Sequence, residues 1–475
     1  MLEKTPPPLV RAAETTVAPA VAKPAMHPRT RALLEGPILP VLLRLAAPNV
    51  LVMLVQAAIG LVETYFVGQL GTEALAGVSL VFPAVMLMQM MSAGAMGGGI
   101  SSAIARALGG GRRQDADALA LHAMAIAVVF GATFTVAMLL GGRALYSALG
   151  GQGATLDAAM TYSNIVFAGM VLLWIFNSLA NVIRGSGNMA TPALVTVVGA
   201  LFVIPASPLL IFGWGPLPRL GVAGGGVAVV AYYLAGSIVL AAYLRRRNGP
   251  VRLPFSGVAL RWPLFADILR VGAVAAIVTV GTNVTVAVTT GLVGSFGAAA
   301  IAGYGTGSRL EYLLVPLVFG LGGPLVAMVG TNIGAGRLDR ALRAAWIGAA
   351  IATAFTEAIG LAAAAFPLSW LALFGTEPGM LDAGARYLRI VGPVYGLFGL
   401  GMALYFASQG AGRLLWPLGA AFVRFAIATG GGYLALRLTG DMSYVFVALS
   451  VALVAFGLIN AGAVAGGAWK GRSPP

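Results

Sequence analysis

The sequence predicts an all-α polytopic membrane protein with twelve transmembrane helices in two six-helix lobes, and three observations support this. Hydrophobic residues make up 59% of the 475 positions, and charged residues only 9%, against about 25% in an average soluble domain. Twelve apolar segments each reach the ~20 residues needed to cross a bilayer. The two halves of the chain also repeat one another at a constant spacing.

The apolar segments fall into two groups of six. The first six are 39–68, 74–105, 116–142, 157–183, 189–214 and 220–244, and the second six are 267–294, 299–331, 341–367, 384–409, 412–437 and 442–468. Several exceed ~20 residues, so tilt or kinks are expected. The predicted parts are a disordered basic cytoplasmic tail at 1–37, an N-lobe at 38–244, a cytoplasmic linker at 245–266, a C-lobe at 267–469 and a tail at 470–475.

An internal repeat relates the two groups. GTEALAG at 71–77 matches GAAAIAG at 297–303, and LGGGRRQDA at 108–116 matches IGAGRLDRA at 333–341. The first pair is 226 residues apart and the second 225, and Tyr162 matches Tyr387 at the same separation of 225 residues as the second pair. Each half has an even number of segments, which makes the repeat parallel, with its axis along the membrane normal. Transporters built in this way bind their substrate between or within the halves; a channel made of two repeats is the alternative.

Charge and composition limit the partners. Basic residues lie in the tail and in alternate loops, so the positive-inside rule places both termini in the cytoplasm and the protein in a prokaryotic inner (plasma) membrane. The net charge of +14 is too dispersed for a nucleic-acid groove. The absence of cysteine excludes a disulfide or a thiol nucleophile, and the absence of a phosphate loop excludes ATP-driven transport by this chain alone. We expect no cofactor or metal, no enzymatic activity, and a monomer that contacts the bilayer and a small-molecule substrate.

Three carboxyl groups stand inside apolar segments, where an ionisable group indicates function by default. They are Glu63, Glu311 and Glu357, and all three are candidates for cation or proton coupling. Glu63 is the strongest, because burial disfavours its charged form and allows it to carry a proton. The alternative for Glu63 is packing through hydrogen bonds, and the alternative for Glu311 is a structural ion pair. Arg424 is a possible structural partner of Glu357.

Further polar and flexible side chains are candidates for a substrate cavity. They are Gln56, Met86, Asn177, Asn181 and Asn283. Gln56 lies two helical turns before Glu63, and methionine surfaces adapt to varied apolar ligands. Helix packing is the alternative role for each. Pro48 interrupts the backbone hydrogen bonds of the first segment, which predicts either a static kink or a moving hinge.

The ordered motifs resemble the multidrug and toxin extrusion (MATE) family of cation-coupled transporters over nearly all of 38–470. They include Pro48, Gln56 and Glu63 in P-x7-Q-x6-E-T-x2-V-G, followed by LGTEALAG, IRGSGNMATP, SPLLIFGWG and GSRLEYLLVP. The resemblance implies a V-shaped pair of lobes with alternating access, a hinge at Pro48, and coupling roles for Glu63 and Glu311. One departure is Ser207, which stands where the family commonly has an aspartate; we expect it to line the cavity.

The predicted function is a proton-coupled antiporter that exports lipophilic, cationic drugs or metabolites. Sodium coupling is less favoured, because the second-lobe acids used by the sodium-coupled branch are absent: no acid occurs at 268–310 or at 383–440. A lipid-linked precursor flippase is the second alternative, although such proteins usually need a cationic cavity, and few arginines here are intramembrane. A membrane-embedded enzyme or receptor would need catalytic or signalling elements that we do not find in this sequence.

Overall fold

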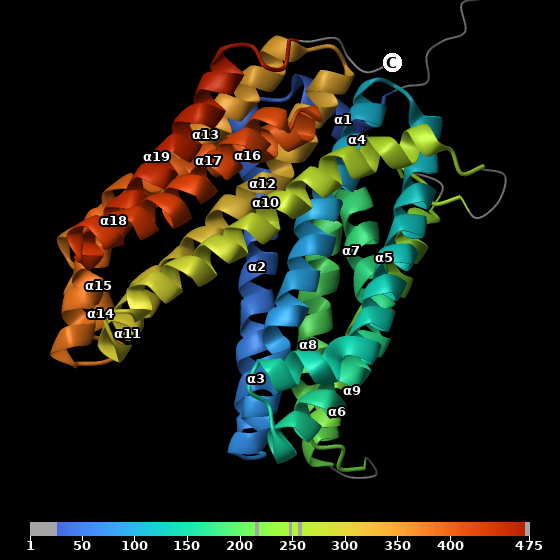
Figure 1. Ribbon diagram of the computed structural model, residues 1–475. Coiled ribbons are helices and arrows are strands. Elements are labelled where there is room, and N and C mark those ends of the chain that lie inside the picture. Colours follow the sequence, from blue (N-terminus) through green and yellow to red (C-terminus); the bar gives the residue numbers. More distant parts are fainter. Residues whose placement is uncertain (1–25, 214–217, 247–248, 255–258, 471–475) are drawn as a thin grey trace, which may run out of the picture.

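Two bundles of α-helices diverge from one end of the molecule (Figure 1). The computed structural model describes residues 26–213, 218–246, 249–254 and 259–470. Within these residues, eleven helices are long and apolar enough to cross a membrane, and the pair α6–α7, bent by 46°, supplies a twelfth span. The prediction of an all-α protein with twelve spans in two lobes is therefore confirmed.

The elements of each lobe follow one another along the chain. After the short α1 (Pro28–Glu35), the N-lobe contains α2 (Ile38–Gly68), α3 (Thr72–Gln89), the π-helix η1 (Met90–Met96), α4 (Gly97–Gly109), α5 (Arg113–Ala148), α6 (Gly153–Ala168), α7 (Met170–Gly185), α8 (Ala190–Phe212) and α9 (Val222–Leu244). The C-lobe contains α10 (Trp262–Gly294), α11 (Ala298–Ser308), α12 (Glu311–Gly334), α13 (Leu338–Ala365), α14 (Pro367–Leu371), α15 (Pro378–Val391), the 3-10 turn η2 (Gly392–Val394), α16 (Tyr395–Ala411), α17 (Leu415–Ala426), the π-helix η3 (Ile427–Gly431), α18 (Gly432–Thr439) and α19 (Met442–Ala465).

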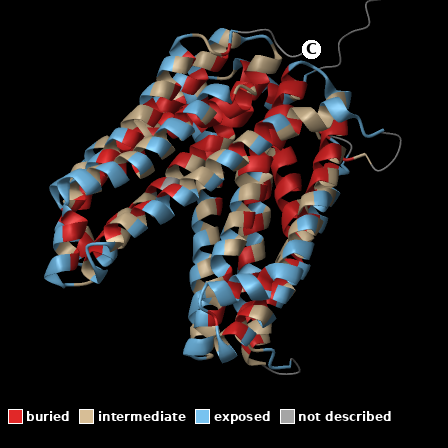
Figure 2. Ribbon diagram, viewed as in Figure 1, coloured by how far each residue is buried: buried red, intermediate tan, exposed pale blue. Residues whose placement is uncertain are grey.

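Each lobe has its own packed interior. In the N-lobe, Trp174 is buried and stacks on Phe130 and Phe134, with ring centroids 5.4 and 5.8 Å apart. Large apolar side chains such as Leu140 and Leu438 lie exposed on the outer faces, as expected of helices whose solvent is lipid. Buried residues concentrate at the end where the lobes meet (Figure 2).

The lobes touch at the end of the molecule that carries α1 and the last described residues, here called the terminal end. There α4 crosses α12 so closely that a methyl group on Gly109 would overlap the Thr331 carbonyl. Arg106 of α4 forms an ion pair with Asp267 of α10 at 2.6 Å and donates to the carbonyl of Gly410 at 3.2 Å. Small residues let membrane helices approach in this way, so the terminal end is tightly closed.

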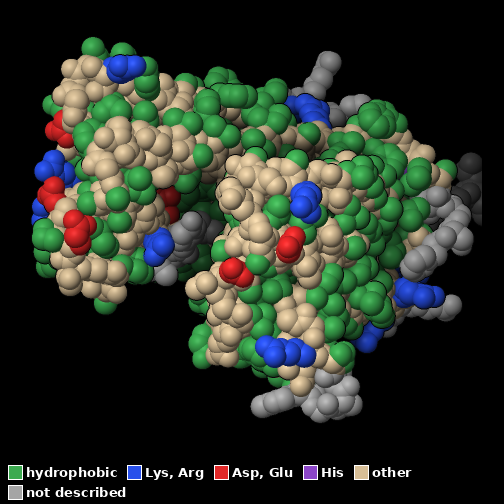
Figure 3. All heavy atoms as spheres, turned by 60° about the horizontal axis from the view of Figure 1, so that its bottom comes forward, with side chains coloured by type: hydrophobic (Ala, Val, Ile, Leu, Met, Phe, Trp, Pro, Cys, Tyr) green, Lys and Arg blue, Asp and Glu red, His purple; other side chains and the backbone are tan. Residues whose placement is uncertain are grey.

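The opposite end, here called the far end, is open. Seen from that side, the molecule is hollowed between the lobes (Figure 3). The helices diverge towards this end because the close crossing contacts lie at the terminal end. The described structure is thus open on one side of the membrane and closed on the other.

The predicted disordered tail at 1–37 needs correction. Residues 1–25 lie outside the described residues, but Pro28–Glu35 form α1. Proline is well placed at the start of a helix, and Leu33 and Leu34 at its other end are buried. The chain therefore gains an ordered element that local composition did not predict.

Helix α1 joins the two lobes. Arg29 donates to the Tyr243 hydroxyl of the N-lobe at 2.9 Å. On the C-lobe side, Asn332 donates to the Leu33 carbonyl at 3.1 Å and Arg337 to the Leu34 carbonyl at 2.9 Å. These donors satisfy carbonyl groups that the end of a helix leaves free, so α1 crosses the boundary between the lobes at the terminal end.

Candidate functional site

The carboxyl group of Glu63 lies between helices of the N-lobe. Glu63 belongs to the last turns of α2, and its Oε1 accepts a hydrogen bond of 2.6 Å from the Tyr162 hydroxyl of α6. On α9, a Cβ atom at Gly225 would lie only 3.3 Å from the same oxygen. The glycine thus lets α9 come close to the carboxyl group, which is half-buried among three helices.

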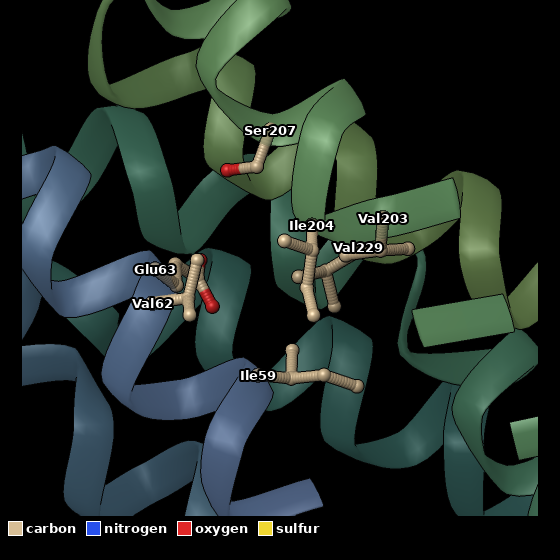
Figure 4. A pocket seen from close by; sticks show the side chains of 7 residues that line it. All are labelled: Ile59, Val62, Glu63, Val203, Ile204, Ser207 and Val229. Atoms are coloured by element: carbon tan, nitrogen blue, oxygen red, sulfur yellow. The ribbon is translucent and has the colours of Figure 1, made fainter. Parts of the chain in front are cut away.

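A small pocket adjoins Glu63. It has a volume of about 10 Å³ and is lined by apolar side chains, Glu63 and Ser207 of α8. The Ser207 hydroxyl is buried and has no hydrogen-bond partner among the described residues. Figure 4 shows Glu63 and Ser207 reaching into this space from different helices. The volume is close to the minimum needed to hold one water molecule. A water molecule in this pocket would lie next to the carboxyl group and can exchange a proton with it.

The C-lobe contains a second carboxyl–tyrosine pair. Glu311 accepts a 2.6 Å hydrogen bond from the Tyr387 hydroxyl, which itself lies 3.2 Å from the Tyr395 hydroxyl. Tyr304 packs edge-on against Tyr387, with ring centroids 5.2 Å apart. The site combines a carboxyl group with two tyrosine hydroxyls in an aromatic setting.

The two tyrosines that bind the carboxyl groups occupy repeat-related positions, although the glutamates do not. Tyr162 and Tyr387 are 225 residues apart, whereas Glu63 comes from α2 and Glu311 from the start of α12. Sequence reasoning used these tyrosines only as evidence of the repeat. Their recurrence at one offset, with a hydroxyl able to donate to a carboxyl group, was the signal that could have identified them as site residues.

Glu357 lies elsewhere, in α13. Its Oε2 accepts a 2.7 Å hydrogen bond from the main-chain amide of Gly396, near the start of α16. Among the ion pairs found in the described residues, none joins Glu357 to Arg424. The Arg424 guanidinium instead lies over the rings of Phe398 and Phe456, at 5.7 and 5.5 Å. A carboxylate at a helix start satisfies free amide groups, so Glu357 has a clear structural contact.

Asn177 and Asn181 are buried within the N-lobe. Asn177 donates to the Ser92 hydroxyl at 2.8 Å and to Gln89 at 3.3 Å, and so ties α7 to η1 and α3. Asn181 donates to the Ala93 carbonyl of η1 at 3.3 Å, and to the carbonyl of Asn177 in its own helix at 2.8 Å. These bonds join helices of one lobe, and neither side chain reaches the open space between the lobes in this conformation.

The remaining predicted residues are dispersed. Gln56 lies half-buried on α2, and Met86 is exposed on α3. Asn283 is exposed on α10 and donates to the carbonyl of Thr279 in its own helix at 2.9 Å. Pro48 stands inside α2, which continues as one helix on both sides of it. Among the predicted site residues in the described part of the chain, Glu63 and Ser207 share one pocket.

Two repeat-related helical lobes, open on one side and holding carboxyl groups within their apolar interior, are typical of membrane transporters. The family model described as MatE matches residues 48–209 and 275–434. The chain therefore belongs to the MatE family, the multidrug and toxin extrusion transporters, whose members are transporters rather than enzymes. It is a multi-pass membrane protein, and the family predicted from the sequence is confirmed.

Individual relatives agree with this assignment. The chain is 28% identical over 380 residues to a protein of Shewanella oneidensis named "FAD transporter", covering 79% of this chain and 82% of that one. It is 29% identical over 402 residues to "Probable multidrug resistance protein NorM" of Deinococcus radiodurans, covering 78% and 81%. It also matches a solved outward-facing multidrug resistance MATE family transporter with a TM-score of 0.80 at 23% identity, covering 91% of this chain and 97% of that one.

Proposed function

We propose that this transporter exports lipophilic, cationic drugs or metabolites in exchange for protons. The observation that carries the proposal is the Glu63 carboxyl group, held by the Tyr162 hydroxyl at 2.6 Å beside an apolar pocket. A carboxyl group in such surroundings exchanges a proton at low cost, because its neutral form suits the apolar walls and its charged form suits the tyrosine donor. Protonation can therefore change how α2 packs in its lobe.

The charge distribution supports an orientation for this exchange. Exposed arginines follow the crossing helices at the terminal end, including Arg112, Arg113 and Arg343. By the positive-inside rule, this end lies on the cytoplasmic side of the inner membrane. In that orientation the open side faces outward, where substrate leaves and protons enter, and Glu63 lies towards that side.

A proton gradient is sufficient for useful export. Moving one charge across 100 mV yields about 2.3 kcal/mol, and each pH unit of gradient adds about 1.4 kcal/mol. One proton exchanged for one neutral substrate thus sustains a substrate gradient of roughly 100- to 1000-fold. A monovalent cation moving out against the same potential needs more than one proton for a similar gradient.

The names of relatives support two substrate classes. The Deinococcus relative is named for multidrug resistance, which agrees with a lipophilic, cationic substrate. The Shewanella relative is named an FAD transporter, which makes FAD the second candidate.

The test uses the purified protein in liposomes under an imposed pH gradient without sodium. Ethidium and FAD serve as separate substrates, and Glu63→Gln is compared with Glu311→Gln. We expect ethidium movement that requires the gradient and Glu63, with Glu63→Gln still expressed and folded. Full transport by Glu63→Gln would disprove the mechanism, and movement driven only by sodium would transfer coupling to that ion. Movement of FAD alone would establish the second substrate, and no movement under either gradient would favour a flippase.

A further inference from the structure

An apolar groove lies between the two lobes, away from both carboxyl–tyrosine pairs. Its volume is about 480 Å³, and its walls come from α2 of the N-lobe and from α12 and α13 of the C-lobe. Ala47 and Val50 of α2 face Leu321 of α12 across it, with Ala352 and Phe355 of α13 on the third side. Cavities of roughly 300–1,000 Å³ accommodate a drug-sized ligand or a long hydrocarbon chain.

The walls offer hydrocarbon surface and no free polar group among the described lining residues. Thr356 carries the one hydroxyl there, and it already donates to the Ala352 carbonyl at 2.8 Å. The rest of the lining is alanine, valine, leucine, isoleucine and phenylalanine. A ligand in the groove therefore needs an apolar body, because a polar group placed there would lose its hydrogen bonds.

Two arginines lie towards the terminal end from the groove. Arg44 of α2 is three residues before Ala47, and so lies on the same face of the helix one turn nearer that end. Arg343 of α13 lies further off, about 12 Å along the helix axis from Ile351, which also lines the groove. Both side chains are exposed, and no described residue forms an ion pair or hydrogen bond with either. The exposed Trp346 lies one turn from Arg343, as is common where membrane meets water.

We propose that the groove binds one acyl chain of an anionic phospholipid from the leaflet on the terminal side. The phosphate of this lipid is held by Arg44, and Arg343 adds a second positive charge nearer the terminal end. Lipid tails are as apolar as the groove walls, so apolar contact alone gives little preference for the groove over bulk lipid. Shape and headgroup charge therefore select the occupant, and two unpaired arginines select a negative headgroup.

The bound lipid has a conformational consequence. The groove has walls from both lobes, so its shape depends on how the lobes are placed. A ligand that binds one arrangement better shifts the population towards that arrangement. Anionic lipid in the groove therefore favours the far-end-open form, whatever ion drives transport.

The experiment measures lipid retention by native mass spectrometry on the full-length protein. Palmitoyl-oleoyl phosphatidylglycerol is compared with phosphatidylcholine of the same chains. We expect selective retention of phosphatidylglycerol and about a fivefold loss for each of Arg44→Gln and Arg343→Gln, as for one charge at an anionic surface. Arg143→Gln, an exposed arginine elsewhere on α5, is the control and should change nothing. Ala47→Phe should displace the lipid by filling the groove, whereas Val129→Phe, 62% exposed on α5, should not.

A second measurement follows the lobes and involves no transport. The chain has no cysteine, so Glu73→Cys and Ser295→Cys introduce two spin labels, one on each lobe at the far end. We expect the larger distance to gain population in phosphatidylglycerol vesicles, and Arg44→Gln with Arg343→Gln to remove this gain. Equal retention of both lipids, or unchanged retention in the double variant, would overturn the proposal. Displacement of phosphatidylglycerol by ethidium would instead make the groove a route for substrate, and would also overturn it.

Discussion

Asn49 of α2 donates its side-chain amide to the carbonyl oxygen of Gly320 in α12, at 3.1 Å. That carbonyl has no helical partner, because the residue four positions later is Pro324, which lacks an N–H group. Asn49 is only 5% exposed and directly follows Pro48. Asn49 of the N-lobe thus provides the hydrogen bond that the Gly320 carbonyl of the C-lobe cannot receive within its own helix. This hydrogen bond joins the two lobes.

Replacing Asn49 by alanine should weaken the closed terminal end. The Gly320 carbonyl would lose its donor in a buried position, at a cost of about 1–3 kcal/mol. We expect spin labels on the two lobes to report a broader or shifted distance distribution than in the parent. Asn283→Ala is the control, because Asn283 is exposed and bonds only within its own helix. An unchanged distribution in Asn49→Ala would mean that this bond does not hold the lobes.

Adding one methyl group at Gly109 should separate the lobes at their crossing. The new Cβ would overlap the Thr331 carbonyl of α12, and backbone atoms cannot move aside cheaply. We expect Gly109→Ala to lower the thermal unfolding temperature and to reduce the closed population at the terminal end. Gly141→Ala is matched in chemistry, since a Cβ at Gly141 of α5 meets nothing within 4 Å. It should be neutral or slightly stabilising, as alanine favours helix over glycine. Equal effects of the two changes would contradict the close crossing.

Removing one tyrosine hydroxyl should separate the roles of the two carboxyl sites. A hydrogen bond to a charged group is worth about 1.5–3 kcal/mol, and Tyr162 gives such a bond to the ionised form of Glu63. Without this donor the ionised form of Glu63 is less stable. We therefore expect Tyr162→Phe to shift the pH profile of liposome transport to higher pH. Tyr387→Phe makes the same chemical change beside Glu311 and should leave that profile in place. The reverse result would assign coupling to the C-lobe.

Truncation of α1 should loosen the closed end without unfolding either lobe. Deleting residues 1–36 removes the carbonyl groups that Asn332 and Arg337 bind and the contact of Arg29 with Tyr243. We expect the lobes to move apart more often at this end. The measurement is the rate of backbone amide hydrogen exchange at the start of α13, which should increase. Deletion of residues 1–25 alone keeps every one of these bonds and serves as the control. Identical hydrogen exchange in the two truncated proteins would show that α1 does not hold the two lobes together.

Segment length and apolarity predicted the spans well, because these properties are local. The predicted fourth segment, 157–183, corresponds to α6 and α7, and the bend between them falls at Gly169. Composition could not predict α1, because its stability comes from contacts with side chains some 300 positions away. A sequence window contains none of those partners.

The candidate site shows the same limit. Glu63 was recognisable as a carboxyl group in an apolar segment, but Tyr162 lies 99 residues away and was not assigned to it. The amides of Asn177 and Asn181 were equally compatible with a cavity and with helix packing. The arrangement of η1 against α7 determines their interhelical contacts, and it satisfies them inside one lobe.

The crossing at Gly109 acts as a fulcrum for the whole molecule. Helix α10 has 33 residues and is about 50 Å long at 1.5 Å per residue. One degree of tilt at its fixed end therefore moves its free tip by about 1 Å. A change of about ten degrees at the terminal end therefore moves the far-end tip of α10 by about 9 Å. The width of the opening is thus set by small angles at the closed end, where the helices are packed most tightly.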